Sequence, residues 1–277
     1  MTSKRVAIVT GASSGMGEAL SEDLVQRGWQ VAMADIQPNK DLASKLGENA
    51  SFHICDVSDY DSQAACFQEV WVKYGRLDAL CANAGIVDKS SIYILDHKDS
   101  DEIPPPPNLA CTDIDYKGVI YGTQLAIHFM RKNKTPGGSI VATASIAAVH
   151  PHETYPEYDG AKAAVSSQSS FTALKENIRI NCILPGIVAT KIIPPEMVAA
   201  VSPECLTPVG TIVSAYNKCL DDESLHGEAI ECSVDKLLLT PRPDFQNGRV
   251  SKRAVTVWDP LFKMYHHEVS QLPDAIA

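Results

Sequence analysis

Short apolar runs alternate with longer amphipathic segments along most of the chain, and this alternation constrains the fold more than any other feature. The runs VAIV, VAMA and SIVA are apolar throughout, as expected for strands buried on both faces. A repeated order of strand, helix and strand predicts a parallel sheet covered by helices on both sides. Right-handed crossovers then make the α/β sheet doubly wound, with a ligand crevice at the carboxyl ends of the strands. The expected strands are residues 5–9, 30–34, 51–55, 79–81, 139–143 and 178–184.

A glycine-rich loop follows the first expected strand directly. The strand KRVAIV leads into TGASSGMG, residues 10–17, and then into a helical pattern. Glycines permit a tight turn and a close approach to a pyrophosphate, while a helix N-terminus offers free N–H groups. This position predicts a dinucleotide site, with a purely structural turn as the alternative. The residues expected to bind the cofactor here are Gly11, Ser13, Ser14, Gly15, Met16 and Gly17.

An acidic residue ends the second expected strand, about twenty residues beyond the glycine loop. Asp35, followed by Ile36, stands where a carboxylate accepts hydrogen bonds from the adenosine ribose. The negative charge of Asp35 would repel the 2′-phosphate of NADP, and no arginine or lysine immediately follows Asp35 to offset this repulsion. We therefore expect NAD as the cofactor in preference to NADP. An ordinary exposed aspartate before a turn is the alternative interpretation.

The chain length suits one large domain, because α/β folds often exceed 200 residues as a single unit. We expect a single-domain, Rossmann-type, NAD-binding catalytic domain over residues 1–246 and a C-terminal extension over residues 247–277, whose role stays open. A polar insertion, residues 86–108, ends in four prolines, and we expect it at the rim of the active site. A second Pro-rich segment, at about residues 190–210, is a candidate substrate lid. Plain surface connections explain both segments equally well.

Charge and cysteine usage argue against several classes of partner. The formal net charge of −10 would repel phosphate backbones and anionic lipid surfaces, so we expect neither nucleic acid nor membrane partners. We identify neither a membrane-spanning run nor a signal peptide. The eight cysteines have no CxxC pair and no zinc-type spacing. We therefore expect reduced, mostly buried thiols, no metal site and a cytoplasmic protein.

Motifs beyond the glycine loop resemble those of the short-chain dehydrogenase/reductase family. Residues 10–17 have its TGxxxGxG spacing, and residues 55–57 are similar to its adenine-binding element. Residues 83–85 are similar to its NAG element, and residues 185–190 to its nicotinamide-binding element. The resemblance covers residues 4–191 and implies a nicotinamide cofactor. It assigns to that cofactor Asp56, Val57, Asn83, Ala84, Gly85, Pro185, Gly186, Val188, Thr190, Tyr158 and Lys162.

Ser145, Tyr158 and Lys162 are the candidate catalytic residues, and the last two match the family's YxxxK signature. Free tyrosine, with a pKa of about 10, is a poor base at neutral pH. A lysine four residues on shares its helix face, where the ammonium favours the phenolate. Ser145 would hold the substrate oxygen, and the resemblance implies that Lys162 also binds the nicotinamide ribose. Each residue also has an ordinary structural interpretation, and Tyr155 is a second phenol nearby, disfavoured by Asp159.

One position departs from the pattern that this chain resembles. The family usually has an asparagine where this chain has Asp115, in a predicted helix, and that asparagine helps to hold a water joining the lysine to solvent. An aspartate could still hold the water, raise nearby pKa values or weaken turnover. Asp115 is therefore a fourth candidate catalytic residue whose effect stays open.

The leading expectation is an oxidoreductase that interconverts a secondary alcohol and a ketone by NAD-dependent hydride transfer. One alternative is an NADH-dependent ketoreductase of secondary metabolism, since the same residues serve both directions. The other is a repurposed non-redox NAD-binding protein on the same fold. Within the family, the chain resembles the branch of 15-hydroxyprostaglandin dehydrogenase, with residues 225–230 similar to its last strand.

The small-molecule substrate is expected to be a lipophilic or polycyclic alcohol, although ordinary core packing explains the same side chains. The turn at residues 150–152 either orients a polar group or is simply solvated, and the solvated turn is favoured. The resemblance implies a homodimer or homotetramer formed through helices at residues 115–132 and 158–174. The expected pocket residues are Ile146, Val149, His150, Ile187, Ile192, Ile193 and Met197.

Overall fold

The computed structural model describes residues 4–169, 176–270, 272 and 275–277. The chain forms two compact units, Met1–Leu239 and Thr240–Ala277. The second unit thus begins at residue 240, whereas we expected the C-terminal extension to begin at residue 247. The last part of the expected helix at residues 158–174 lies outside the described residues.

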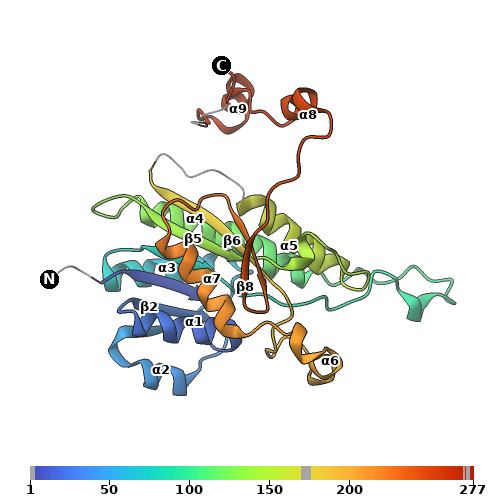
Figure 1. Ribbon diagram of the computed structural model, residues 1–277, viewed down its shortest axis with the longest axis horizontal. Coiled ribbons are helices and arrows are strands. Elements are labelled where there is room, and N and C mark those ends of the chain that lie inside the picture. Colours follow the sequence, from blue (N-terminus) through green and yellow to red (C-terminus); the bar gives the residue numbers. More distant parts are fainter. Residues whose placement is uncertain (1–3, 170–175, 271, 273–274) are drawn as a thin grey trace. The chain divides into compact units, whose positions relative to one another are not determined.

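A mostly parallel sheet forms the centre of the first unit, which confirms the predicted doubly wound α/β class (Figure 1). The strand order is β3-β2-β1-β4-β5-β6-β7-β8, and every neighbouring pair is parallel except β7 and β8. The strands are β1 (Val6–Thr10), β2 (Gln30–Asp35), β3 (Ala50–Ile54), β4 (Ala79–Ala82), β5 (Gly138–Thr143), β6 (Ile178–Pro185), β7 (Ala229–Ser233) and β8 (Lys236–Leu239).

Helices cover both faces of this sheet, and each face has its own apolar core. Figure 1 shows α1, α2 and α7 on one side and α3, α4 and α5 on the other. Strand side chains alternate between the two cores: Ile8 packs with α3 and α4, while Ala7 and Val9 pack with α1 and α7. The helices are α1 (Gly15–Gln26), α2 (Lys40–Leu46), α3 (Tyr60–Tyr74), α4 (Gly118–Met130), α5 (Pro156–Ser169), α6 (Pro195–Ala200) and α7 (Val209–Asp221).

The strand order reverses between β1 and β4, and partly buried polar contacts join their carboxyl ends. Thr10 Oγ1 accepts hydrogen bonds from the backbone N–H groups of Asn83 at 3.0 Å and Ala84 at 3.1 Å. The Asn83 amide donates in turn to the Thr10 carbonyl at 3.0 Å. Ligands of open α/β sheets bind outside such a reversal point, so these contacts hold the loops that flank the crevice.

The far edge of the sheet differs from the sequence expectation. The expected last strand, residues 225–230, is correct only at its end, because β7 begins at Ala229. Gly227 has a φ of +73°, which turns the chain before the strand, and its N–H donates to the Ile180 carbonyl at 2.8 Å. The antiparallel strand β8 was not predicted, since its sequence KLLL has no alternation and its residues are largely exposed.

Seven of the eight cysteines are buried, as predicted, and all eight are free thiols in the structure. Burial raises the pKa of Cys182 to about 11 and the pKa values of Cys219 and Cys232 to about 12. Cys205 alone is exposed, at the end of a short 3₁₀ turn, Pro203–Cys205. Among the described residues, no helix combines the length and the apolar character needed to cross a bilayer.

The second unit consists of two short helices joined by irregular segments. They are α8 (Gly248–Ala254) and α9 (Asp259–His266). An isolated bridge pairs Trp258 with Ile276, and the Asp259 N–H donates to the Ile276 carbonyl at 2.8 Å. None of the described residues in this unit is buried, so it has no apolar core of its own.

Candidate active site

A cleft of about 290 Å³ lies at the carboxyl ends of β1, β2 and β4. It brings together most of the residues that we expected to hold a dinucleotide. It is also lined by residues that we did not identify, among them Ser58, Ile86 and Lys191. The expected residues that line it are Gly11, Ser14, Gly15, Met16, Asp35, Ile36, Asp56, Val57, Asn83, Ala84, Gly85 and Thr190.

The glycine loop forms the tightest part of this cleft. Gly11 has a φ of +64° and Gly15 a φ of +56°, a region that side chains rarely adopt. A Cβ on Gly17 would lie 2.2 Å from the Gly11 carbonyl oxygen, so the loop closes on itself only with glycine there. Helix α1 begins at this loop after Ser14, which makes no side-chain cap. The exposed backbone and uncapped helix end fit a pyrophosphate.

Asp35 shapes the outer end of the cleft, where we expect the adenosine. Its two carboxylate oxygens accept hydrogen bonds from the Ser13 and Gln37 N–H groups, each at 3.0 Å. Ser13 and Asp35 also line an open hollow that includes Lys40 and Lys191. We had found no cation immediately after Asp35, but the fold brings these two lysines to the same hollow, one from α2 and one from the segment after β6.

A second cavity, of about 140 Å³, adjoins the nucleotide cleft and shares Met16, Thr190 and Ile192 with it. Ser145 and Tyr158 both line this cavity. The other expected residues that line it are Pro185, Gly186, Val188, Ile146, Ile187, Ile193 and Met197.

Two of the expected pocket residues lie elsewhere. Val149 and His150 are exposed and line neither cavity, because the 3₁₀ turn Ile146–Ala148 directs the following residues outward. The His150 N–H donates to the Ile146 carbonyl at 3.0 Å, which continues that turn. His152, in the turn for which we favoured the solvated interpretation, is 42% exposed and also lines the cavity.

Ser145 is fixed by the turn that it begins. Its backbone is extended, and its Oγ accepts a hydrogen bond from the Ala147 N–H at 3.1 Å. The side chain is 6% exposed. Because the oxygen is engaged as an acceptor, the hydroxyl proton remains available to a ligand in the cavity.

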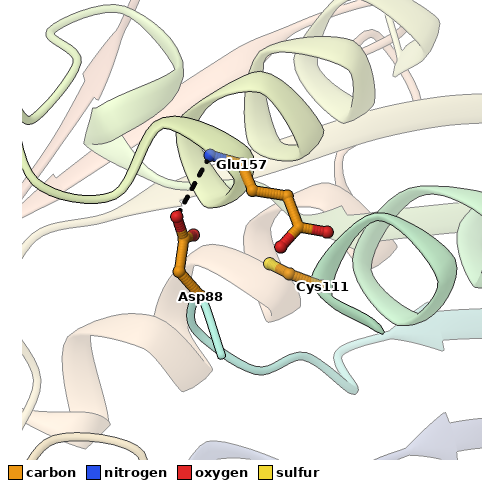
Figure 2. Close-up of side chains that lie close together, drawn as sticks. All are labelled: Asp88, Cys111 and Glu157. Carbon is orange, nitrogen blue, oxygen red and sulfur yellow. Dashed lines mark hydrogen bonds between the residues drawn. The ribbon is translucent and has the colours of Figure 1, made fainter. Parts of the chain in front are cut away.

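Tyr158 lies in the first turn of α5, and Asp88 holds that turn in place. Figure 2 shows the hydrogen bond from the Glu157 N–H to Asp88. The Asp88 carboxylate accepts hydrogen bonds from the N–H groups of Tyr158 at 2.7 Å and Glu157 at 3.2 Å. Such a side chain satisfies free donors at a helix start and complements its dipole. We did not identify Asp88, because it lies in the segment expected as an insertion, far upstream of the helix it caps. Its partner Glu157 is 69 residues later in the chain.

Asp88, Cys111 and Glu157 bring three potential metal-ligand atoms within 4.8 Å of one another, a group that we did not predict (Figure 2). The Asp88 oxygens already accept backbone N–H groups, and Glu157 Oε1 accepts the Thr112 N–H at 2.8 Å. Burial raises the pKa of the Cys111 thiol above its usual range, which keeps it protonated. The three residues therefore brace the start of α5 against the segment before α4.

Lys162 forms a buried ion pair with Asp115. Its Nζ lies 3.0 Å from Asp115 Oδ2, donates to the Thr143 carbonyl at 2.9 Å and lies 5.6 Å from the centre of the Tyr158 ring. Asp115, in the π-helical turn Thr112–Lys117, is fully buried, and its Oδ1 accepts the Ile86 N–H at 2.8 Å.

Burial and charge shift the pKa values of this pair. Burial raises the pKa of Asp115, against the opposing effect of the Lys162 ammonium. Burial alone would lower the pKa of Lys162, but attraction to the Asp115 carboxylate and to the negative charge of ionised Tyr158 outweighs it and raises the value. Lys162 is therefore cationic at neutral pH, with a carboxylate rather than an amide as its neighbour.

Gly85 separates this ion pair from the nucleotide cleft. A Cβ on Gly85 would lie 2.9 Å from Asp115 Oδ2 and 3.2 Å from Lys162 Nζ. The ammonium thus lies directly behind a wall residue of the cleft, although Lys162 and Asp115 line neither cavity. Asp115 and the Thr143 carbonyl account for two of the three Nζ donors of Lys162.

Comparisons with known proteins identify the family of this chain. A family model described as short chain dehydrogenase matches residues 5–197. The short-chain dehydrogenase/reductase prx6 of Penicillium rubens is 52% identical, over 99% of this chain and 98% of its own length. The NAD(+) 15-hydroxyprostaglandin dehydrogenase of Rattus norvegicus is 30% identical, over 68% of this chain and 70% of its own length.

A solved structure shows the same fold. The 3-ketoacyl-(acyl-carrier-protein) reductase of Brucella melitensis, complexed with NADH, aligns with a TM-score of 0.72 at 21% identity, covering 84% of this chain and 98% of its own. The fold, the family model and the extent of identity together support one assignment. The chain belongs to the short-chain dehydrogenase/reductase family.

Proposed function

We propose that this protein interconverts a secondary alcohol and a ketone with NAD as the redox partner. One observation carries the proposal: Ser145 and Tyr158 line an apolar cavity that shares three wall residues with the nucleotide cleft. A substrate in the small cavity would lie next to a nucleotide in the larger one. The apolar lining favours a lipophilic small molecule.

The chemistry follows from the charges around Tyr158. In oxidation, the Tyr158 phenolate accepts the hydroxyl proton while Ser145 holds the same oxygen. The Lys162 ammonium lies 5.6 Å from the ring centre, so a positive charge stands beside the group that exchanges the proton. NAD, when bound, supplies the acceptor for the hydride that leaves the carbinol carbon. The products are a ketone, NADH and one proton, which Tyr158 releases to solvent.

The same residues serve ketone reduction, in which Tyr158 donates the proton. The rat relative is named for NAD(+)-dependent oxidation of a hydroxyl, and the Brucella neighbour for reduction of a ketone with NADH present. We propose oxidation as the leading direction. A progress curve run from both sides at fixed pH measures which direction the enzyme supports faster.

We propose NAD in preference to NADP because Asp35 places a carboxylate at the adenosine end. Lys40 and Lys191 line the same hollow and offset part of its repulsion of a 2′-phosphate. We expect a modest preference, about tenfold in Kd, equivalent to about 1.4 kcal/mol. Titration of the protein with each nucleotide measures it, and equal affinities would contradict the role of Asp35.

Tyr158→Phe tests the catalytic assignment. Without the phenol, turnover should fall by about 100-fold to 10,000-fold, the usual range for loss of a general base. Binding of NAD, measured by fluorescence titration, should stay within about twofold, because the nucleotide cleft does not include Tyr158. A variant that keeps its rate would overturn the assignment.

The Asp115 ion pair favours a second candidate function, nucleotide binding with little redox activity. The Asp115 carboxylate offsets the positive charge of the Lys162 ammonium, and this charge would otherwise act on Tyr158 without compensation. The native protein would then bind NAD and turn over no member of a panel of lipophilic secondary alcohols and ketones. If the native protein turns over any of these compounds and Tyr158→Phe does not, the protein is an oxidoreductase.

We also propose a cytoplasmic homodimer or homotetramer that associates through α4 and α5. The seven buried, reduced thiols are compatible with a reducing compartment. Exposed apolar side chains on α4 include Ile120. Light scattering of the purified protein measures the assembly, and a charge introduced by Ile120→Lys should dissociate it.

A further inference from the structure

A histidine and a buried carboxylate form a pair at the rim of the substrate cavity. His152 Nδ1 lies 2.9 Å from Asp159 Oδ1. Asp159 belongs to α5 and is 6% exposed, whereas His152 belongs to the loop before α5 and lines the cavity. The pair therefore joins the catalytic helix to the wall of the cavity.

The contacts of His152 fix its orientation and its tautomer. A carboxylate accepts hydrogen bonds, so Nδ1 carries the proton in this contact. The imidazole also packs edge-on against Tyr155, with ring centres 5.7 Å apart, and its centre lies 6.4 Å from that of Tyr158. The His152 side chain is 42% exposed, and its Nε2 has no hydrogen-bond partner among the described residues.

The buried carboxylate is poorly explained by folding alone. Asp159 Oδ2 is buried and makes no hydrogen bond within the described part of the chain. Burying a carboxylate costs free energy unless its partners are good, and His152 is the side chain paired with it here. Such a carboxylate is well suited to orient an imidazole whose other nitrogen binds a ligand.

We propose that His152 recognises a second oxygen function on the substrate, a hydroxyl or a carbonyl, and that Asp159 positions it. This inference rests on the proposed function, because it concerns the substrate of the same cavity. Ser145 and Tyr158 hold the reacting oxygen, while His152 Nε2 holds an oxygen farther along the same molecule. The ring centres of His152 and Tyr158 lie 6.4 Å apart, so one small molecule can reach both side chains.

Two probes that differ in one oxygen test the proposal: 1-tetralol and 4-hydroxy-1-tetralone. Calorimetry on the nucleotide-free protein measures Kd for each, so neither probe is turned over during the titration. The native protein should bind 4-hydroxy-1-tetralone about fivefold to tenfold more tightly, as one hydrogen bond predicts. His152→Ala should abolish this difference, and His152→Gln, which keeps a donor and an acceptor, should restore part of it.

Val149→Ala is the matched control, because Val149 is exposed in the same loop and lines neither cavity. It should leave both Kd values unchanged. Asp159→Asn should weaken the discrimination without affecting binding of 1-tetralol. Equal binding of the two probes by the native protein, or discrimination that survives His152→Ala, overturns the inference. Failure of the proposed function has a different signature, which is turnover that persists in Tyr158→Phe.

Discussion

The candidate site has two halves, the nucleotide cleft and the substrate cavity. The nucleotide half is shaped mainly by main chain, whereas the substrate half is lined mainly by side chains. In the first, Gly11 and Gly17 leave no room for a Cβ, and Thr10 and Asn83 lock neighbouring loops. In the second, Ile192 and Met197 line the cavity from an exposed segment. A main-chain site tolerates almost no substitution, while a side-chain site changes its ligand by changing its lining.

The largest expected effect is on the nucleotide half, from Gly17→Ala. The new Cβ would lie 2.2 Å from the Gly11 carbonyl oxygen, so the loop must move away from its present path. We expect NAD affinity to fall by about 100-fold or more, equivalent to about 3 kcal/mol. Titration with NAD measures the loss.

Gly160→Ala is the control for this variant. Gly160 lies in α5, and a Cβ there meets nothing within 4 Å. It should leave NAD affinity unchanged and stabilise the protein by about 0.5–1 kcal/mol, because alanine is the better helix former. Equal NAD affinities in the two variants would contradict the contrast between the halves.

The next effect concerns Asp115, at the junction of the two halves. Its carboxylate raises the pKa of Lys162 and compensates its charge, so Asp115→Asn should leave a fuller positive charge near Tyr158. The acidic limb of the kcat profile should then move to lower pH by about one unit. At high pH the variant should lose activity earlier, because burial lowers the pKa of Lys162 once the carboxylate is gone.

A matched control for Asp115→Asn lies two residues away. Asp113→Asn removes an exposed carboxylate that pairs with Lys117 at 2.7 Å, so it should leave the pH profile unchanged. Rates measured from pH 5.5 to 10 follow both limbs. Superimposable profiles for native protein and Asp115→Asn would show that the carboxylate does not act on the catalytic charge.

The smallest effect is expected in the substrate half. Ile193→Ala shortens a half-buried side chain in the cavity wall, and we expect KM for a lipophilic substrate to rise by about threefold to tenfold. The Kd for NAD should not change, because Ile193 does not line the nucleotide cleft. A parallel loss of NAD affinity would mean that the two halves do not act independently.

The sheet and the nucleotide cleft were predictable because each rests on local sequence signals. Apolar runs marked β1 to β6 to within a residue or so, and the glycines of residues 11–17 must lie together because they are adjacent in the chain. The antiparallel β8 was missed, since its four residues are exposed and carry no periodicity. Periodicity reports burial, so an exposed strand leaves little signal.

The long-range contacts of the site were not predictable in the same way. Asp88 caps α5, Lys191 joins the hollow beside Asp35, and Asp159 holds His152 at the cavity. Each contact joins side chains whose neighbours in sequence give no hint of it, because the folded sheet decides which loops meet. The direct ion pair of Asp115 with Lys162 belongs to the same class, although both residues had been identified separately.

The burial pattern of the thiols gives this protein a natural reporter. Cys205 is exposed within residues 190–210, the segment that we propose as the substrate lid. The other seven cysteines are buried and, where their pKa values are raised, slow to ionise. A maleimide fluorophore should therefore attach at one place in the native protein without engineered substitutions. Its emission would follow that segment in real time as nucleotide and substrate are added.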